Sequence, residues 1–281
     1  MTLIIVTILA HNEERRIGTC LTSLLAEPGD FPIHVVVNGS TDRTAEIAAS
    51  YGSRVMVRVY EQGGKSRSWN RFVLDDMSDF ADVHVFVDGD AEVVTGSIAA
   101  LAEAFTNKPE ANAVAGQPRN GRNVARYQAE QMHTHGLFGD LYALRGTFLA
   151  QMKRANIRLP DDLIGDDGLI GALAKTNLAN EDHWSNDRLI VCPHAGFLCE
   201  PVNLFHPRTW EMHYKRMVNY SVRHFQNQIV SAIMRGPGPE ALPKRLSEQY
   251  HEWLPRFNAR SGWHNCWFDS RALSRMAGAA A

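Results

Sequence analysis

Short apolar segments alternate with amphipathic segments along the first half of the chain. The apolar segments are rich in Val, Ile and aromatic residues, which is typical of buried strands. Between them, apolar residues recur at helical spacing, as Ile17, Leu21 and Leu24 do. The predicted strands are Leu3–Ala10, Phe31–Val37, Val55–Tyr60, Val83–Val87 and Ala113–Gly116. The predicted helices are Glu13–Leu25 with Asn12 as its cap, a helix ending at Gly52, Ser66–Met77 and Ser97–Phe105.

This alternation predicts an α/β fold with a mostly parallel sheet, right-handed crossovers and helices on both faces. The second half is less regular. Leu141–Met152 reads as mixed strand and helix, a helix starts near Leu169, and a long helix covers Thr209 to about Met234. Three short strands are expected near Leu189–Val191, Gly196–Leu198 and Val202–Phe205. We therefore divide the chain into a domain over residues 1–205 and a helical C-terminal extension over 206–281.

Composition narrows the function classes. The 281 residues are 44% hydrophobic and 21% charged, which is ordinary for a globular protein with a core. The net charge of −2 gives no indication of a nucleic-acid partner. The four cysteines match neither a metal-site spacing nor a disulfide framework, so we expect free thiols. No apolar stretch is long enough to span a bilayer, and a cytoplasmic location is expected.

Polar turns follow three of the predicted strands. They are His11-Asn12-Glu13, Asn38-Gly39-Ser40 and Asp88-Gly89-Asp90. Because parallel strands end at the same edge of a sheet, these turns should converge on one crevice. The two carboxylates of the last turn form an oxygen-rich site for a hard divalent cation, which would hold the phosphates of a substrate.

Four motifs in register resemble the GT-A nucleotide-sugar glycosyltransferases of family 2. They are Ile8-Leu9-Ala10-His11-Asn12-Glu13-Glu14, Val37-Asn38-Gly39-Ser40-Thr41-Asp42-Arg43-Thr44, Gly63-Gly64-Lys65-Ser66-Arg67-Ser68-Trp69-Asn70 and Val87-Asp88-Gly89-Asp90. The resemblance covers about residues 2–175. It implies a GT-A, Rossmann-like fold and a nucleotide-diphosphate sugar as donor.

The same resemblance implies roles for individual residues. Asp88 and Asp90 would bind Mn²⁺ or Mg²⁺ on the donor diphosphate. Ala10, Asn12 and Glu13 match the turn that contacts the nucleoside, and Lys65 matches a residue that contacts base or phosphate; an exposed loop lysine is the alternative. Where the family usually has Asp-Asp or Asp-Asn, this chain has Val37-Asn38, so the first Asp, which commonly meets the uracil ring, is missing. Asn38 is therefore a substitute donor contact, and the identity of the base stays open.

A second acidic cluster supplies the expected general base. Gly165-Asp166-Asp167 resembles the family's (Glu/Asp)-Asp motif, which makes Asp167 the residue that deprotonates the acceptor hydroxyl. Asp166 would orient the loop or modulate the pKa of Asp167. Capping of the following helix is compatible with that role. Asp161 or Asp162 is the rival base. Family membership implies inversion by a single displacement.

Two residues of the second half are weaker candidates for the donor site. His206 would complete the metal shell, and Arg216 would contact the diphosphate; a helix cap and a solvated arginine are the alternatives. The Trp- and Arg-rich tail is expected to pack onto the domain or form a dimer contact. Peripheral contact with the inner membrane face is the other interpretation.

The sequence therefore predicts a transferase that moves one sugar to a hydroxyl of a glycan, a lipid-linked molecule or a small molecule. The family's processive Gln-x-x-Arg-Trp motif is missing from the sequence, which favours single addition in the synthesis of bacterial surface glycan or exopolysaccharide. Two other functions stay open: a sugar-nucleotide pyrophosphorylase, and a non-catalytic module that binds nucleotide sugars. A pyrophosphorylase requires a basic, Gly-rich loop after the first strand. This chain has His11-Asn12-Glu13-Glu14 there, which counts against that function.

Overall fold

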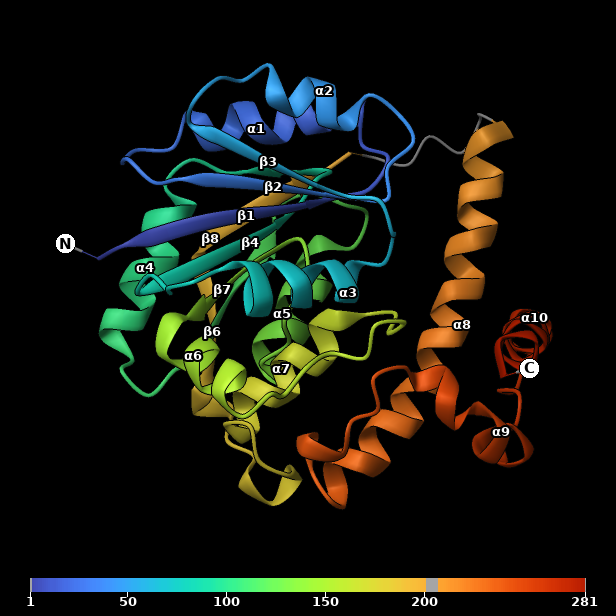
Figure 1. The fold of residues 1–281 in the computed structure, drawn as a ribbon. Coiled ribbons are helices and arrows are strands. Elements are labelled where there is room, and N and C mark those ends of the chain that lie inside the picture. Colours follow the sequence, from blue (N-terminus) through green and yellow to red (C-terminus); the bar gives the residue numbers. More distant parts are fainter. Residues whose placement is uncertain (1, 201–206, 281) are drawn as a thin grey trace.

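A computed structural model describes residues 2–200 and 207–280 of the chain. One twisted sheet of eight strands lies at its centre, in the order β3-β2-β1-β4-β7-β6-β8-β5 (Figure 1). The strands are β1 Ile4–Ala10, β2 Ile33–Asn38, β3 Val55–Tyr60, β4 Val83–Asp88, β5 Ala91–Val93, β6 Ala113–Pro118, β7 Leu141–Arg145 and β8 Leu189–Cys199. This mixed α/β architecture confirms the predicted fold class.

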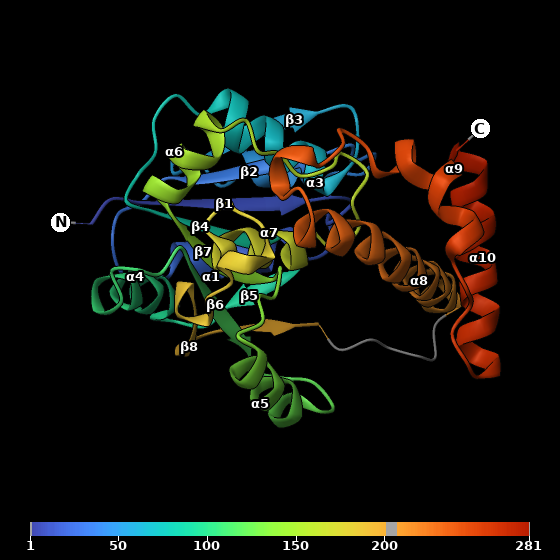
Figure 2. The ribbon, with the colours of Figure 1, turned by 90° about the horizontal axis from the view of Figure 1, so that it is seen from below.

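Helices cover both faces of the sheet (Figures 1 and 2). On one face lie α1 Ile17–Leu25, α2 Thr44–Ala49 and α4 Ser97–Asn107. On the other lie α3 Lys65–Asn70, α6 Gly146–Arg154 and α7 Asp166–Thr176, and the C-terminal half of α8 Pro207–Arg235 packs there too. A π-helical segment, Arg71–Asp76, continues α3. The remaining α-helices are α5 Val124–Thr134, α9 Tyr250–Trp253 and α10 Trp263–Ala280.

The predicted parallel core is present, but the sheet also contains antiparallel pairs. β1, β2, β3 and β4 pair in parallel, and so do β6 and β8. β7 runs antiparallel to both β4 and β6, and the short strand β5 pairs antiparallel with β8. The reversal at β7 matters because it brings the start of that strand to the edge where β1, β2 and β4 end.

Several boundaries differ from the prediction. The first helix begins at Ile17, because Asn12 takes a left-handed conformation (φ 56°) and its side chain bonds another loop instead of capping a helix. The two strands expected near Leu189–Val191 and Gly196–Leu198 are one strand, β8. The strand expected at Val202–Phe205 lies outside the described residues.

The C-terminal extension is helical, as predicted. In Figure 2, α8 leads away from the sheet and its outer part is crossed by α10. Within the described residues, no helix combines the length and the apolar character needed to cross a membrane.

Candidate active site

The turn after β4 lies directly against the end of β1. Asp88 pairs with Leu9 in the register of the two strands, and the Gly89 N–H donates to the Leu9 carbonyl (3.0 Å). A Cβ on Gly89 would lie 2.9 Å from the Cβ of Ala10, so only glycine fits this approach. The Asp-Gly-Asp sequence therefore places Asp88 and Asp90 beside Ala10 at the carboxyl edge of the sheet.

A third carboxylate, which sequence analysis missed, joins these two. Asp140 immediately precedes β7, and its carbonyl accepts the Asp88 N–H (3.2 Å). One carboxylate oxygen each from Asp88, Asp90 and Asp140 lies within 4.8 Å of the other two. Three oxygens at this spacing suit a hard divalent cation. Asp140 thus fits the metal shell alongside the two predicted ligands, whereas the predicted ligand His206 lies outside the described residues.

The electrostatics of this cluster are unfavourable without a cation. Burial raises the pKa of the Asp88 carboxyl, although the Lys65 ammonium 2.7 Å away opposes the shift. Burial also raises the pKa of Asp140, and the nearby charge of Asp90 adds to the effect. Arg16 donates to Asp90 (3.2 Å) and partly offsets its charge. Concentrated, partly buried negative charge of this kind is typical of functional sites and makes this cluster a candidate.

Lys65 connects the two acidic groups of the edge. Its Nζ lies 2.7 Å from Asp88 and 3.7 Å from Asp166, the first residue of α7. Burial alone would lower the pKa of Lys65, but these carboxylates hold it well above its usual value. The second Asp166 oxygen is buried and has no hydrogen-bond partner among the described residues. Lys65 is therefore a fixed positive charge between the candidate metal site and the candidate base.

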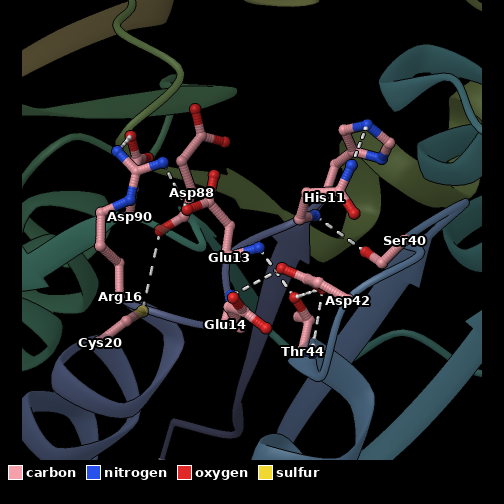
Figure 3. A network of polar contacts seen from close by, with 11 residues as sticks. His11, Glu13, Glu14, Arg16, Cys20, Ser40, Asp42, Thr44, Asp88 and Asp90 are labelled. Atoms are coloured by element: carbon pink, nitrogen blue, oxygen red, sulfur yellow. Dashed lines mark hydrogen bonds and ion pairs between the residues drawn. The ribbon is translucent and has the colours of Figure 1, made fainter. Parts of the chain in front are cut away.

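Glu13 lies beside Asp88 and Asp90 (Figure 3). Its carboxylate is 2.6 Å from Arg16. Burial raises the pKa of Glu13 to about 7, helped by the charge of Asp90 and opposed by Arg16. This predicted donor residue therefore belongs to the same network of like charges.

The loops after β1 and β2 interlock beside the cluster, as the sticks in Figure 3 show. The Asn12 N–H donates to Ser40 Oγ (3.0 Å), and Asn12 Oδ1 accepts the Thr41 N–H (2.9 Å). The Glu13 N–H donates to Thr44 Oγ1 (2.8 Å). These bonds satisfy the free amides of the first loop and fix Asn12 and Glu13 at the edge.

Asn38 organises a third loop. Its Oδ1 accepts the Gly64 N–H (2.8 Å), and the residue is only 4% exposed. Gly64 directly precedes Lys65, the first residue of α3. The Asn38 side chain therefore positions the glycine loop that carries Lys65, while its direct contact with a base stays a prediction.

Of the acidic residues near α7, Asp166 and Asp167 lie beside the cluster. A Cβ built on Gly139 would lie 3.6 Å from Asp88 Oδ2 and 3.8 Å from the Asp167 Cβ, so these side chains flank one spot. The rivals have other partners. Asp162 accepts the amides of Leu246 and Ser247 (2.7 and 3.0 Å).

The C-terminal extension holds this acidic loop. Arg223 on α8 forms an ion pair with Asp167 (2.9 Å). One turn later, buried Gln226 accepts the Ile164 N–H (2.8 Å) and donates to the Asp162 carbonyl (2.9 Å). α8 thus contributes to the arrangement of the candidate base, a role that the sequence did not indicate.

A cavity of about 440 Å³ opens between the acidic cluster and the outer half of α8. Arg216 lines this cavity, and its contact with the diphosphate stays a prediction. The lining residues are Arg16, Asp90, Asp140, Cys199, Glu200, Met212, His213, Arg216 and Tyr220.

Comparisons with known proteins show the family and the fold. The family model of glycosyl transferase family 2 matches residues 5–165. Among curated proteins, the 4,4'-diaponeurosporenoate glycosyltransferase of Staphylococcus aureus (strain USA300) is 43% identical over 56 residues. That match spans 20% of this chain and only 15% of the relative's length.

Solved structures resemble nearly the whole chain. Mannosyltransferase PcManGT from Pyrobaculum calidifontis, in complex with GDP-Man and Mn²⁺, has a TM-score of 0.57 at 16% identity, over 99% of this chain and 86% of its own. TarS residues 1–349 from S. aureus, with UDP-GlcNAc, has a TM-score of 0.56 at 17% identity, over 99% and 82%. Glucosyl-3-phosphoglycerate synthase from Mycobacterium tuberculosis, with Mn²⁺ and UDP, has a TM-score of 0.52 at 21% identity, over 79% and 80%. At these identities the likeness concerns the fold.

Proposed function

The chain belongs to glycosyltransferase family 2, and from that premise we propose a metal-dependent, inverting transferase that uses a nucleotide-diphosphate sugar. The observation that carries the proposal is the convergence of Asp88, Asp90 and Asp140 at the carboxyl edge of the sheet. Such an edge is where open α/β sheets bind their ligands.

Asp88, Asp90 and Asp140 would hold Mn²⁺ or Mg²⁺. A cation there would offset the negative charge that builds on the departing diphosphate. Positively charged side chains would offset the same negative charge. Lys65 lies beside Asp88, and Arg216 faces the cluster across the cavity, so both are suited to contact the diphosphate.

Asp167 is the proposed general base. It accepts the proton of the acceptor hydroxyl while the hydroxyl oxygen bonds to the anomeric carbon and the bond to the diphosphate oxygen breaks. This is a single displacement, so the configuration at the anomeric carbon inverts. Asp166 and Lys65 orient the groups around it, and Arg223 fixes the Asp167 carboxylate.

The donor nucleotide and the acceptor are open within this proposal. One of the similar structures holds GDP-Man and another holds UDP-GlcNAc. The interlocked loops that carry Asn12, Glu13 and Asn38 are the candidates for contact with the nucleoside. The acceptor is the hydroxyl of a glycan, a lipid-linked molecule or a small molecule, and synthesis of bacterial surface polysaccharide would use such a step.

A panel of nucleotide sugars tests the proposal. UDP-Glc, UDP-GlcNAc and GDP-Man are offered with Mn²⁺, Mg²⁺ or EDTA, and two readouts are taken: thermal stabilisation and release of nucleoside diphosphate. A donor at about 100 times its Kd stabilises the native protein by roughly 2.7 kcal/mol. We expect one donor to do so only with a cation, and to be slowly hydrolysed.

The variant Asp167→Asn separates the competing functions. A transferase keeps the metal-dependent stabilisation and loses release of nucleoside diphosphate. A binding module shows stabilisation and no release even in the wild type. A pyrophosphorylase forms nucleoside triphosphate when pyrophosphate is added. Unchanged release in Asp167→Asn would remove Asp167 from the role of base.

A further inference from the structure

α10 crosses the outer part of α8 (Figure 2), and aromatic side chains gather at this crossing. The rings of Tyr214 on α8 and Trp267 on α10 are 5.6 Å apart between centroids. The Arg271 guanidinium lies 5.3 Å from the Trp267 ring centroid. Trp263, one turn before Trp267, is 86% exposed. We call Tyr214, Trp263, Trp267 and Arg271 the aromatic face.

This face has the chemistry of a membrane–water interface. Tyr214 and Trp267 remain 40% and 45% exposed although they contact each other. Tyrosine and tryptophan combine an apolar ring with a polar group, and arginine keeps its charge in water while its stem covers apolar surface. Such side chains favour the headgroup region of a bilayer over water or hydrocarbon.

Charge is divided unevenly between the two parts of the chain. Residues 1–206 carry 18 Lys and Arg against 26 Asp and Glu, a formal charge of −8. Residues 207–281 carry 11 against 5, a charge of +6. Both acidic residues of α8 and α10 are already paired, Glu211 with Lys215 and Asp269 with Arg260. The extension therefore attracts an anionic surface while the catalytic domain is repelled by it.

From these observations we propose that the aromatic face docks on an anionic lipid bilayer. Basic residues near a membrane surface are drawn to anionic headgroups, and the tryptophans insert between them. A symmetric dimer through the same face would bring like charges together, because the same patch meets itself across the twofold axis. Charge therefore favours a bilayer over a symmetric dimer through this face.

The docked orientation has a consequence for the acceptor, and this step rests on the proposed function. The helix that carries Tyr214 also lines the cavity beside the acidic cluster, through Met212, Arg216 and Tyr220. Tyr214 lies two positions from both Met212 and Arg216, so the aromatic face and the cavity lie on opposite sides of α8, about one helix diameter (roughly 10 Å) apart. An acceptor anchored in a bilayer on that face would have to reach across this width. The acceptor class that fits is an amphiphile, anchored in the membrane, with a hydroxyl on its headgroup.

Vesicle co-sedimentation tests the docking without donor or acceptor. The full chain is mixed with vesicles of phosphatidylcholine alone, or of phosphatidylcholine with roughly 30% phosphatidylglycerol. We expect binding to the anionic vesicles at least about tenfold tighter, and a loss of that preference at about 0.5 M salt. Equal binding to both vesicles, or none to either, would overturn the proposal.

Two surface variants and one control localise the contact. Trp263→Ser and Arg271→Glu should each weaken binding to anionic vesicles by about fivefold or more, and circular dichroism checks their fold. Trp184→Ser is the matched control, because Trp184 is 44% exposed on the catalytic domain beside Lys175. Equal loss in all three variants would contradict the assignment of the face.

The same variants distinguish a dimer from a membrane contact. Light scattering of the wild type across protein concentrations should give a mass that Trp263→Ser leaves unchanged. A dimer that dissociates in Trp263→Ser would overturn the proposal. Donor-dependent stabilisation by Mn²⁺ is measured in parallel, so that failure of membrane docking and failure of the proposed transferase are seen separately.

Discussion

The carboxylates at the sheet edge and those that join the C-terminal extension are in opposite electrostatic states. At the edge, Asp88, Asp140 and Glu13 all have raised pKa values, because burial and mutual repulsion disfavour their charge. In the extension, burial alone would raise the pKa of Asp269, but hydrogen bonds from Arg260 lower it to about 2. Asp162 likewise accepts two backbone amides.

The difference separates two uses of the same side chain. A carboxylate that stabilises the fold is given donors for its oxygens, as Asp269 and Asp162 are. A carboxylate that binds a cation lies near other negative charge, and the bound cation neutralises that charge. The edge therefore has the electrostatics expected of a binding site, whereas the extension stabilises the loop that carries Asp167.

The largest effect is expected at the edge itself. Asp140→Asn should lower donor turnover about 100- to 1000-fold, because it removes a charge that would hold the cation. The same change should leave the metal-free protein as stable as the wild type or more so, since a raised pKa shows that the charge is unfavourable. Turnover with Mn²⁺ and melting with EDTA measure the two effects. A metal-free variant less stable than the wild type would contradict the difference drawn between the edge carboxylates and those of the extension.

Asp269→Asn should have the opposite signature. The ion pair between buried Asp269 and partly exposed Arg260 is lost, which should cost about 2 kcal/mol of unfolding free energy at neutral pH. Because the folded pKa is depressed, the stabilisation is present above the unfolded value of 3.8 and disappears as the pH falls toward 2. Urea unfolding of wild type and variant between pH 7 and pH 2 should converge at the acidic end. A pH-independent difference would contradict the explanation.

Arg223 connects the two regions, and its removal tests that connection. Arg223→Ala should lower turnover of the donor by about 30-fold with little change in KM, because the carboxylate of Asp167 loses its fixed orientation. Arg223→Lys should restore part of the activity. Arg235→Ala on the same helix removes an exposed pair with Glu181 and serves as control. Equal loss in both alanine variants would point to general disturbance of α8.

Glu13→Gln should have the smallest effect. It tests whether the negative charge of Glu13 destabilises the folded protein. The folded pKa of Glu13 is about 7 against 4.5 for an unperturbed glutamate, so folding is penalised increasingly as the pH rises from 4.5 and fully above 7. The variant should be more stable than wild type by about 1–2 kcal/mol at pH 8, and equally stable near pH 3.5, where the carboxyl is mostly neutral in both the folded and the unfolded state. Thermal unfolding at the two pH values without metal provides the comparison. A variant less stable at pH 8 would show that the Arg16 pair outweighs the burial.

Local patterns predicted much of the fold. The strands of the parallel core follow from apolar β-branched runs, and the edge that gathers Asn12, Asn38 and Asp88 follows from their parallel arrangement. Asp140 was missed because its place depends on the antiparallel direction of β7, which a short apolar run does not specify. Had β7 been assigned as antiparallel, the residue before its first position would have fallen at the same edge.

Other features depend on contacts between distant segments, which no local pattern encodes. Asn12 was expected to cap a helix, yet it bonds the Thr41 amide 29 residues away. Arg223 looks like any solvated helix arginine in the sequence, and its pairing with Asp167 follows only from the packing of α8. The candidate base was identified from its motif, but the residues that hold it were not.

Anomalous X-ray scattering from crystals soaked with Mn²⁺ and a stabilising donor nucleotide tests the central claim most directly. The account predicts one manganese peak within coordinating distance of carboxylate oxygens of Asp88, Asp90 and Asp140, with the diphosphate as a further ligand. A manganese ion held elsewhere, or a nucleotide bound at this edge with no ion beside the three carboxylates, would contradict it.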